Sequence, residues 1–409
     1  MNNTQKIYFS NIFEWFDFTL FLFFSVPIGL CFFDQKSSTV AALYSFSVFA
    51  VSYIVRPLGS FLFSYIADKT SALNALRYTM LALTIPSAII GFLPSYDKIG
   101  VFSSFILIIL RCLQGVAAGG ELPCLAVFAF ESSPDSKYKN VWCAITNIGG
   151  MIGVLLASLS AFTLYYFFSV ESINNWAWRI PFILTIPFSI LILNLRWKVS
   201  EGVKLTSKNP LDKEKESIKI ILKMSAVISF MQVSFHVIFM WLPSYLEVYL
   251  LLPSPFVKLL NTSSLVLSVL ATVASAFIGS GEKAHRMVFF SALLCAIAAI
   301  PLFALINTKN HFLVYFSVIS FVFILGLAQG NYIYVLTSSF AGKNKNKLIA
   351  LVYSIPTAVL GGSVSFFCGY FVFILKMNYF PAFYLSFFSV ALCFSFLSSE
   401  NSDNKCNAR

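Results

Sequence analysis

The chain has 409 residues, of which 58% are hydrophobic and only 11% are charged, and its formal net charge is +11. A soluble domain typically carries roughly a quarter charged residues, so this composition excludes a water-soluble enzyme. It also excludes a secreted disulfide scaffold and a disordered or nucleic-acid-binding chain. What remains is a polytopic membrane protein, and a chain of this length can hold roughly a dozen spans of about 20 residues each.

Long apolar runs follow one another along the whole chain. Because the backbone must satisfy its own hydrogen bonds in lipid, runs of this length predict helices, not barrel strands. We expect no cleavable signal peptide, because the first run already contains Glu14 and Asp17. The expected spans cover residues 9–33, 40–66, 76–94, 101–130, 141–168, 178–196, 220–246, 256–279, 287–306, 311–340, 348–375 and 380–398.

The distribution of Lys and Arg predicts the topology. If the N-terminus is cytoplasmic, most of the 28 basic residues fall in segments that are then inside. The outside segments hold only Lys36, Lys98, Arg179, Lys258, Lys309 and Lys376. Since cytoplasmic loops collect Lys and Arg, we expect both termini in the cytoplasm, and the positive charge needs no nucleic-acid partner.

The longest polar stretch divides the expected spans into two groups of six. We expect an N-terminal six-helix half at 1–196, a cytoplasmic linker at 197–219, a C-terminal six-helix half at 220–398 and a short cytoplasmic tail at 399–409. This plan is typical of a transporter that holds its substrate between two halves. The alternative is an unrelated twelve-span protein whose central loop is a coincidence.

Ionisable residues inside apolar helices are costly and indicate function. In the first span, Glu14 and Asp17 are three residues apart and share one helix face. In the fourth span, Arg111, Gln114 and Glu121 lie along one stripe. A stripe that combines a cation, an amide and an acid is typical of a face that lines a pathway.

The second span adds Arg56, so three acids face two arginines. Arginine stays protonated at any working pH, and full ionisation of all five groups in one cavity would leave one negative charge uncompensated. One acid is then expected to bind and release a proton. We take Asp17, Glu121 and Glu14 as proton-coupling candidates, and Arg56, Arg111 and Gln114 as the substrate-binding charge network. The alternative is a set of inert ion pairs that fix helix packing.

The second half has almost no ionisable residues inside its expected spans. Its polar pathway candidates are His236, Gln232, Gln329, Asn331 and Tyr332. A lone membrane histidine is either a packing residue or a pathway residue. Small-xxx-small spacings at Gly115–Gly119 and Gly149–Gly153 predict close helix contacts.

The sequence lacks the common motifs of ATP-binding proteins and hydrolytic enzymes. It lacks a GxxxxGK[ST] loop, an HExxH and a GxSxG, so neither an ATP-driven pump nor a membrane-embedded enzyme is expected. The eight Cys are scattered along the chain. We interpret them as small buried hydrophobic residues and not as metal ligands or disulfides. A gradient-driven carrier without a cofactor is favoured.

Motifs along most of the chain resemble those of the metabolite:proton symporter branch of the major facilitator superfamily, most closely the proline/glycine-betaine transporters. They include EWFDF at 14–18, RPLGSF at 56–61, RCLQGVAAGGE at 111–121, WAWRIPF at 176–182 and WLPSYL at 241–246. The resemblance implies a monomeric, multi-pass carrier of the bacterial inner membrane. It would import a zwitterion such as proline or glycine betaine with a proton, by alternating access.

The inner-gate motif of the superfamily is eroded in this chain. Asp68 and Lys69 remain after the second span, and Glu282 and Arg286 in the second half, but glycines and an arginine are replaced. This leaves a non-transporting, degenerate homologue as one alternative. An organic-anion symporter of the 2-oxoglutarate, citrate or shikimate type is another, because two membrane arginines suit a carboxylate equally well.

Overall fold

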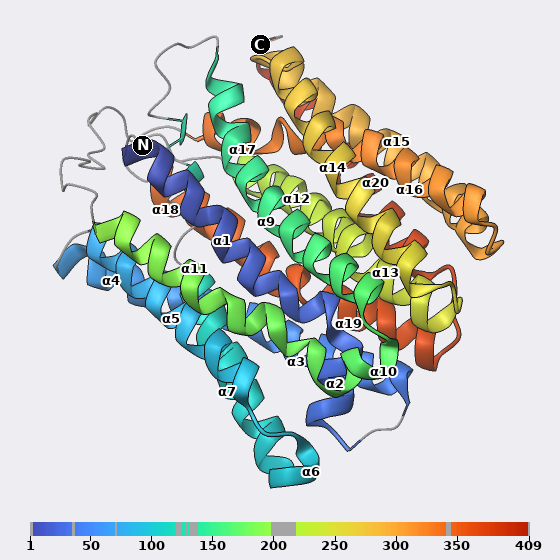
Figure 1. Cartoon of the computed structure of the whole chain (residues 1–409). Helices are drawn as coiled ribbons and strands as arrows, with labels where there is room; N and C mark the ends of the chain where they lie inside the picture. The colour runs from blue at the N-terminus through green and yellow to red at the C-terminus, as the bar shows by residue number, and fades with distance from the viewer. Residues whose placement is uncertain are drawn as a thin grey trace.

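The computed structural model describes residues 3–34, 37–69, 72–119, 125–126, 129–130, 138–197, 218–340 and 345–407. We call 3–197 the first half and 218–407 the second half. The described chain forms a bundle of helices without strands, which confirms the all-α prediction (Figure 1). The first half comprises α1 (Asn3–Phe23), α2 (Ser25–Phe32), α3 (Ser38–Ile54), α4 (Arg56–Lys69), α5 (Ala72–Phe92), α6 (Tyr96–Ile99), α7 (Val101–Gly119), α9 (Lys139–Phe167), α10 (Val170–Ser172), η2 (Ile173–Ala177) and α11 (Arg179–Trp197).

The second half alternates α-helices with short π-helical turns, labelled η. It comprises α12 (Ile218–Phe235), η3 (His236–Trp241), α13 (Leu242–Ser244), η4 (Tyr245–Tyr249), α14 (Ser254–Ile278), α15 (Glu282–Asn307), α16 (His311–Gln329), α17 (Tyr332–Ser338), α18 (Lys345–Pro356), η5 (Thr357–Gly361), α19 (Ser363–Gly369), η6 (Tyr370–Ile374) and α20 (Phe380–Asn407). Such turns are rare and occur often at functional sites. One of them, η5, follows Pro356, which has no N–H to donate to the helical ladder.

The described helices agree with the twelve expected spans. Nine are long and apolar enough to cross a membrane, and two bent pairs, with angles of 65° and 49°, can each form one more span. The shorter apolar helix at 77–92 corresponds to the third expected span. The large apolar side chains on the outside, such as Phe61 and Phe312, suit contact with lipid and not with water.

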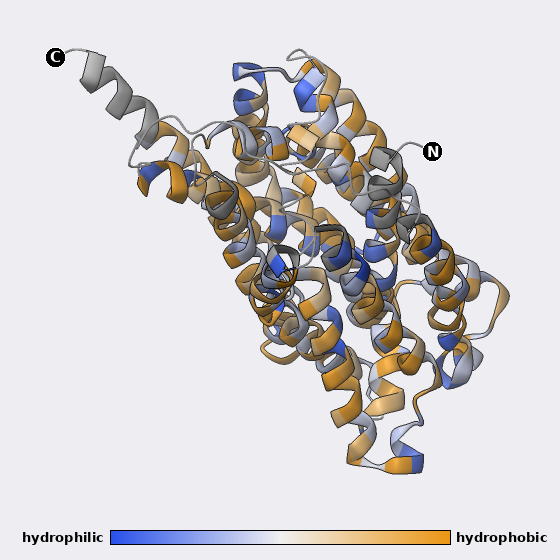
Figure 2. Ribbon diagram, turned by 90° about the vertical axis from the view of Figure 1, so that its left-hand side faces the viewer, coloured by the Kyte–Doolittle hydropathy of each residue, from blue (hydrophilic) through white to orange (hydrophobic). Residues whose placement is uncertain are grey.

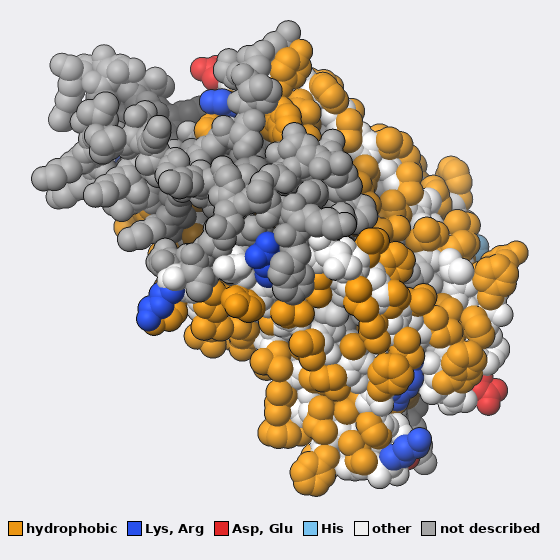
Figure 3. Space-filling model, turned by 60° about the vertical axis from the view of Figure 1, so that its left-hand side comes forward, with side chains coloured by type: hydrophobic (Ala, Val, Ile, Leu, Met, Phe, Trp, Pro, Cys, Tyr) orange, Lys and Arg blue, Asp and Glu red, His pale blue; other side chains and the backbone are white. Residues whose placement is uncertain are grey.

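Hydropathy is arranged accordingly. Figure 2 shows hydrophobic residues along most of the helices, with hydrophilic residues at helix ends and at some positions in the middle of the bundle. In the space-filling view, hydrophobic side chains cover much of the visible face, and only a few Lys and Arg are visible on it (Figure 3). This pattern matches a protein surrounded by the hydrocarbon core of a bilayer.

Both termini lie at one end of the bundle, as an even number of spans requires (Figure 1). We call the opposite end, where α2, α6, α10 and α13 lie, the distal end. The halves meet where α9 packs on α14 and α3 packs on α19.

Glycines allow the closest helix contacts. A Cβ on Gly115 would lie 1.9 Å from the Ser52 carbonyl oxygen, and one on Gly153 would lie 2.2 Å from that of Ile12. The close contacts predicted at Gly115–Gly119 and at Gly153 are thereby confirmed.

Candidate transport site

A buried polar network joins three helices of the first half. Asp17 on α1 accepts a hydrogen bond of 2.6 Å from the Ser87 hydroxyl on α5. The side-chain amide of Gln114 on α7 donates to the same hydroxyl, and Arg111 Nη1 donates to Gln114 Oε1 over 2.7 Å. All four side chains are fully buried. The structure therefore brings together Asp17, Arg111 and Gln114, three residues selected from the sequence.

Ser87 was not a sequence candidate, although it connects the acid to the amide. Serines are common in membrane helices, where they usually bond to a carbonyl of the preceding turn, so its identity carried no signal. Ser87 also lies 3.3 Å from the Leu83 carbonyl, which is the ordinary arrangement. Only the packing of α5 against α1 and α7 reveals its second role.

The two arginines lie against aromatic rings. The guanidinium carbons of Arg56 and Arg111 are 4.5 Å and 4.7 Å from the centre of the Phe18 ring. Arg56 is also 3.7 Å from the ring of Tyr53. Aromatic faces attract cations, and this attraction is stronger where water is excluded. The EWFDF segment thus supplies both an acid and a ring that contacts two cations.

Tyr53 and His236 connect the two halves. The His236 Nδ1 lies 2.8 Å from the backbone carbonyl of Gln232, which can only accept, so Nδ1 carries the proton. In a neutral ring Nε2 is then the acceptor, and the Tyr53 hydroxyl donates to it over 3.1 Å. His236 is therefore a contact between halves and not an isolated packing residue. Tyr53 was not a sequence candidate.

Gln232 continues this network within the second half. Its side-chain amide donates to Thr357 Oγ1 over 3.0 Å and to the Tyr353 hydroxyl over 3.4 Å. His236 and Thr357 each begin a π-helical turn. A wider turn changes the direction in which side chains project, which places these polar groups at the interface between the halves.

A narrow cavity of about 40 Å³ lies between the halves. Its lining residues come from α1, α9, α12, α16, α17 and α18, and none of those described is charged. They are Trp15, Thr146, Asn147, Gly150, Met151, Met231, Gln232, Phe235, Gln329, Tyr332, Ile333 and Tyr353. Four aromatic rings and several amides therefore surround one space, and it includes the candidates Gln232, Gln329 and Tyr332.

Asn147 joins the cavity walls. Its side-chain nitrogen donates to the Gln329 carbonyl over 2.9 Å, and its oxygen accepts from the Tyr332 hydroxyl over 3.2 Å. Asn331 does not line the cavity; it accepts a 2.9 Å bond from Asn140 and holds α9 against α17.

Several sequence candidates lie apart from this network or outside the described residues. Glu14 is buried on α1, but it is not a wall of the cavity. Glu121 lies outside the described residues, as does the side chain of Asp68. Lys69 lies at the end of α4, with its ammonium 4.7 Å from the Tyr65 ring. Glu282 and Arg286 form an exposed 3.2 Å pair on one turn of α15.

The described part of the second half contains a buried ion pair that the sequence analysis did not expect. Lys258 Nζ lies 2.7 Å from Glu247 Oε2, and the two side chains are 6% and 15% exposed. The sequence analysis counted Lys258 among the residues of the outside segments, and the structure places it near the start of α14, which begins at Ser254. The pairing itself was not expected, because both residues stand at the edges of apolar runs, where a polar side chain normally indicates a loop.

Comparison with known proteins identifies the fold. The family model described as Major Facilitator Superfamily matches residues 7–365. The chain belongs to this superfamily. It is therefore a multi-pass membrane transporter and not an enzyme, and the predicted fold is confirmed.

Two named relatives show low sequence identity to this chain. The chain is 24% identical over 374 residues to the "Proline/betaine transporter" of Escherichia coli K12, covering 86% of this chain and 74% of that protein. It is 27% identical over 398 residues to a Staphylococcus haemolyticus protein named "Putative proline/betaine transporter", with 93% and 83% covered. A solved D-xylose-proton symporter has a TM-score of 0.74 at 14% identity, with 96% of each chain covered, which shows a shared fold.

Proposed function

We propose that this transporter is a proton symporter that imports a small zwitterion, such as proline or glycine betaine, by alternating access. The observation that carries the proposal is the aromatic cavity between the halves, whose wall Trp15 belongs to the same helix as Asp17. The names of the relatives in E. coli and S. haemolyticus support the same substrate class.

The walls of the cavity suit a molecule without net charge. Trp15, Phe235, Tyr332 and Tyr353 present rings to the space. Such rings attract a substituted ammonium group. Because the lining itself is uncharged, it suits a substrate whose own positive and negative charges cancel. The guanidinium of Arg56 lies 6.0 Å from the Trp15 ring, so a substrate carboxylate beside Trp15 would have a cation within reach.

The buried network of the first half suits proton coupling. Asp17 is fully buried, so a charge on its carboxylate depends on Ser87 and on nearby Arg111. Loss of the proton strengthens the attraction of Asp17 for Arg111, and gain of a proton releases it. Because the network spans α1, α5 and α7, this change would alter how these helices pack. Glu121 and Glu14 remain further candidates for the proton.

The orientation follows from the charged loops. We place the distal end outside and both termini in the cytoplasm of a bacterial inner membrane, since most Lys and Arg then fall in segments on the cytoplasmic side. The two six-helix halves, joined by the linker at 197–219, would rock about the cavity as a monomer. The proton gradient is the energy source, and no cofactor is needed.

Uptake by purified protein in liposomes tests the proposal. Labelled proline and glycine betaine should accumulate when the outside is acidic and should only equilibrate when no gradient is imposed. Unlabelled 2-oxoglutarate, citrate and shikimate serve as competitors. Gradient-driven uptake of an organic acid alone would favour the alternative of an organic-anion symporter, in which Arg56 and Arg111 bind the carboxylates. Absence of uptake for every compound would refute transport and favour a degenerate homologue with an eroded gate motif.

A further inference from the structure

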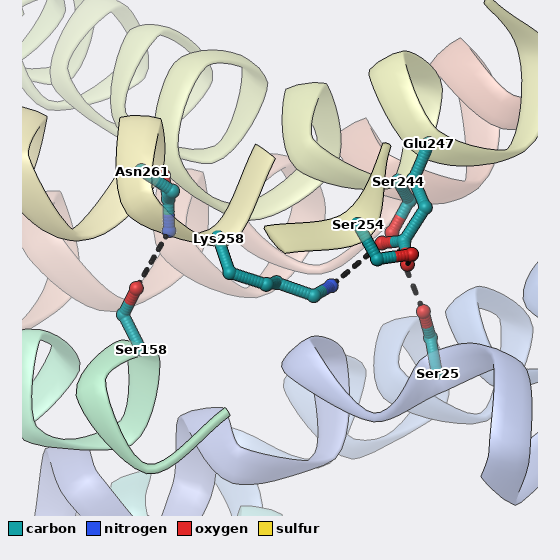
Figure 4. A network of polar contacts seen from close by, with 7 residues as sticks. All are labelled: Ser25, Ser158, Ser244, Glu247, Ser254, Lys258 and Asn261. Atoms are coloured by element: carbon teal, nitrogen blue, oxygen red, sulfur yellow. Dashed lines mark hydrogen bonds and ion pairs between the residues drawn. The ribbon is translucent and has the colours of Figure 1, made fainter. Parts of the chain in front are cut away.

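At the distal end, a cluster of polar side chains outside the transport site lies between the halves. Figure 4 shows it from close by: Ser25 and Ser158 belong to the first half, and Ser244, Glu247, Ser254, Lys258 and Asn261 to the second. Ser25 and Ser244 are 3.4 Å apart, and Asn261 donates to Ser158 over 3.1 Å. Ser158 also lies 2.9 Å from the Thr262 hydroxyl. None of these residues lines the cavity.

The cation of this cluster contacts both halves. Lys258 Nζ bonds to Glu247 Oε2 over 2.7 Å within the second half. The same ammonium lies 4.7 Å from the ring of Tyr165 on α9, in the first half. Ser254 donates to the other oxygen of Glu247 and so fixes the carboxylate. The acid therefore stays with Lys258 when the halves move, whereas the contact with Tyr165 exists only while they are together.

We propose that Lys258 and Tyr165 form the distal gate of the transporter, with Glu247 as the positioning residue for Lys258. The gate closes the cavity on its distal side. Opening separates α9 from α14, which removes the ring from the cation and breaks the bonds at Ser158 and Ser25. A charged pair retained within one half prevents the separated gate from leaving a lone buried charge. The inference rests on the proposed function only in that the distal end faces outside.

The equilibrium between the open and the closed gate can be measured without substrate, from the rate at which a reagent labels a cysteine at the gate. Two proteins are prepared that each contain a single cysteine. The first carries Ser158→Cys at the gate, and the second keeps only the native Cys143, which is buried on α9 beside Thr337 of the second half. A membrane-impermeant maleimide labels the first in intact cells and the second in inside-out vesicles. The variants are then introduced into each background.

Tyr165→Leu should raise labelling of Ser158→Cys about threefold to thirtyfold, because the attraction of ring and cation then no longer favours the closed state. The double variant Glu247→Gln/Lys258→Met should do the same without stranding a charge. Tyr165→Phe keeps the ring and should label like the parent. Lys376→Met is the matched control, because Lys376 lies 5.4 Å from the Tyr249 ring and both belong to the second half.

Three results would overturn the proposal. Unchanged labelling in Tyr165→Leu would show that the contact between Tyr165 and Lys258 does not hold the gate closed. An equal rise of labelling in Lys376→Met would show that loss of any cation beside a ring has this effect. A rise at both Ser158→Cys and Cys143 would show loosening of the fold and not gating. A shifted gate in a protein that transports no substrate would leave the gate standing and refute only the proposed function.

Discussion

Asp17 and Arg111 are linked through two intervening side chains, Ser87 and Gln114, and the described structure has no ion pair within 4 Å between them. Each step of this connection is a hydrogen bond between fully buried side chains, so each depends on the others. In the proposed mechanism, Asp17 gains and loses its proton without an arginine bonded directly to its carboxylate. Interactions of this kind can be tested one side chain at a time.

The first test concerns the proton carrier. Asp17→Asn keeps the shape and the bond from Ser87 but cannot bind and release a proton. Gradient-driven accumulation should disappear, so that the internal substrate concentration only equals the external one, while exchange of substrate across the membrane persists. Glu121→Gln is assayed in parallel. Full accumulation by both variants would remove the proton role from both acids.

The second test concerns the intermediate hydroxyl. Ser87→Ala leaves Asp17 and Gln114 without their shared partner. A hydrogen bond to a charged group contributes roughly 1.5–3 kcal/mol, so we expect proton-driven uptake to fall about tenfold or more. Ser189→Ala is the matched control, because its buried hydroxyl bonds only to the Thr185 carbonyl of its own helix. Equal losses in the two variants would contradict a specific role for Ser87.

The third test concerns the connection between halves. Tyr53→Phe keeps the ring beneath Arg56 but loses the hydroxyl that donates to His236. A neutral hydrogen bond contributes about 1 kcal/mol, so the rate of substrate exchange should change about fivefold. A double-mutant cycle with His236→Phe isolates the pair. Strictly additive effects would show that the two residues act independently.

The fourth test concerns recognition of the substrate. Trp15→Leu removes one aromatic wall of the cavity, and an attraction of about 1–2 kcal/mol for an ammonium group predicts that KM for glycine betaine rises about tenfold. Trp176→Leu serves as control, since Trp176 is 51% exposed and does not line the cavity. An unchanged KM in Trp15→Leu would exclude the aromatic wall from binding.

A fifth test concerns packing between helices. Gly153→Val would place a branched side chain against the Ile12 carbonyl and the Trp15 side chain, where even a Cβ is too close. Loss of this α1–α9 contact should lower the thermal stability of the purified protein by several degrees. Gly91→Val is the milder comparison, because its nearest neighbour is a flexible Ile183 side-chain atom at 3.1 Å. Equal stability of Gly153→Val and the parent would contradict tight packing.

The sequence by itself determined the class of fold, because only helices satisfy the backbone over such long apolar runs. It also singled out Asp17, Arg111 and Gln114, since charged and amide groups inside membrane spans are costly and stand out from their neighbours. These inferences needed no knowledge of which helices touch. They follow from the free-energy cost of removing a polar group from water.

Only the tertiary structure decided which partners these residues have. Ser87, Tyr53 and Tyr165 are ordinary residues in their own helices, and each acquires its contact from a helix distant in the sequence. The pair of Glu247 and Lys258 is buried because α14 and η4 turn toward the first half, although each residue stands at the edge of an apolar run. Burial energy can be read from one residue and its neighbours in the chain, whereas a hydrogen bond between helices depends on how those helices pack.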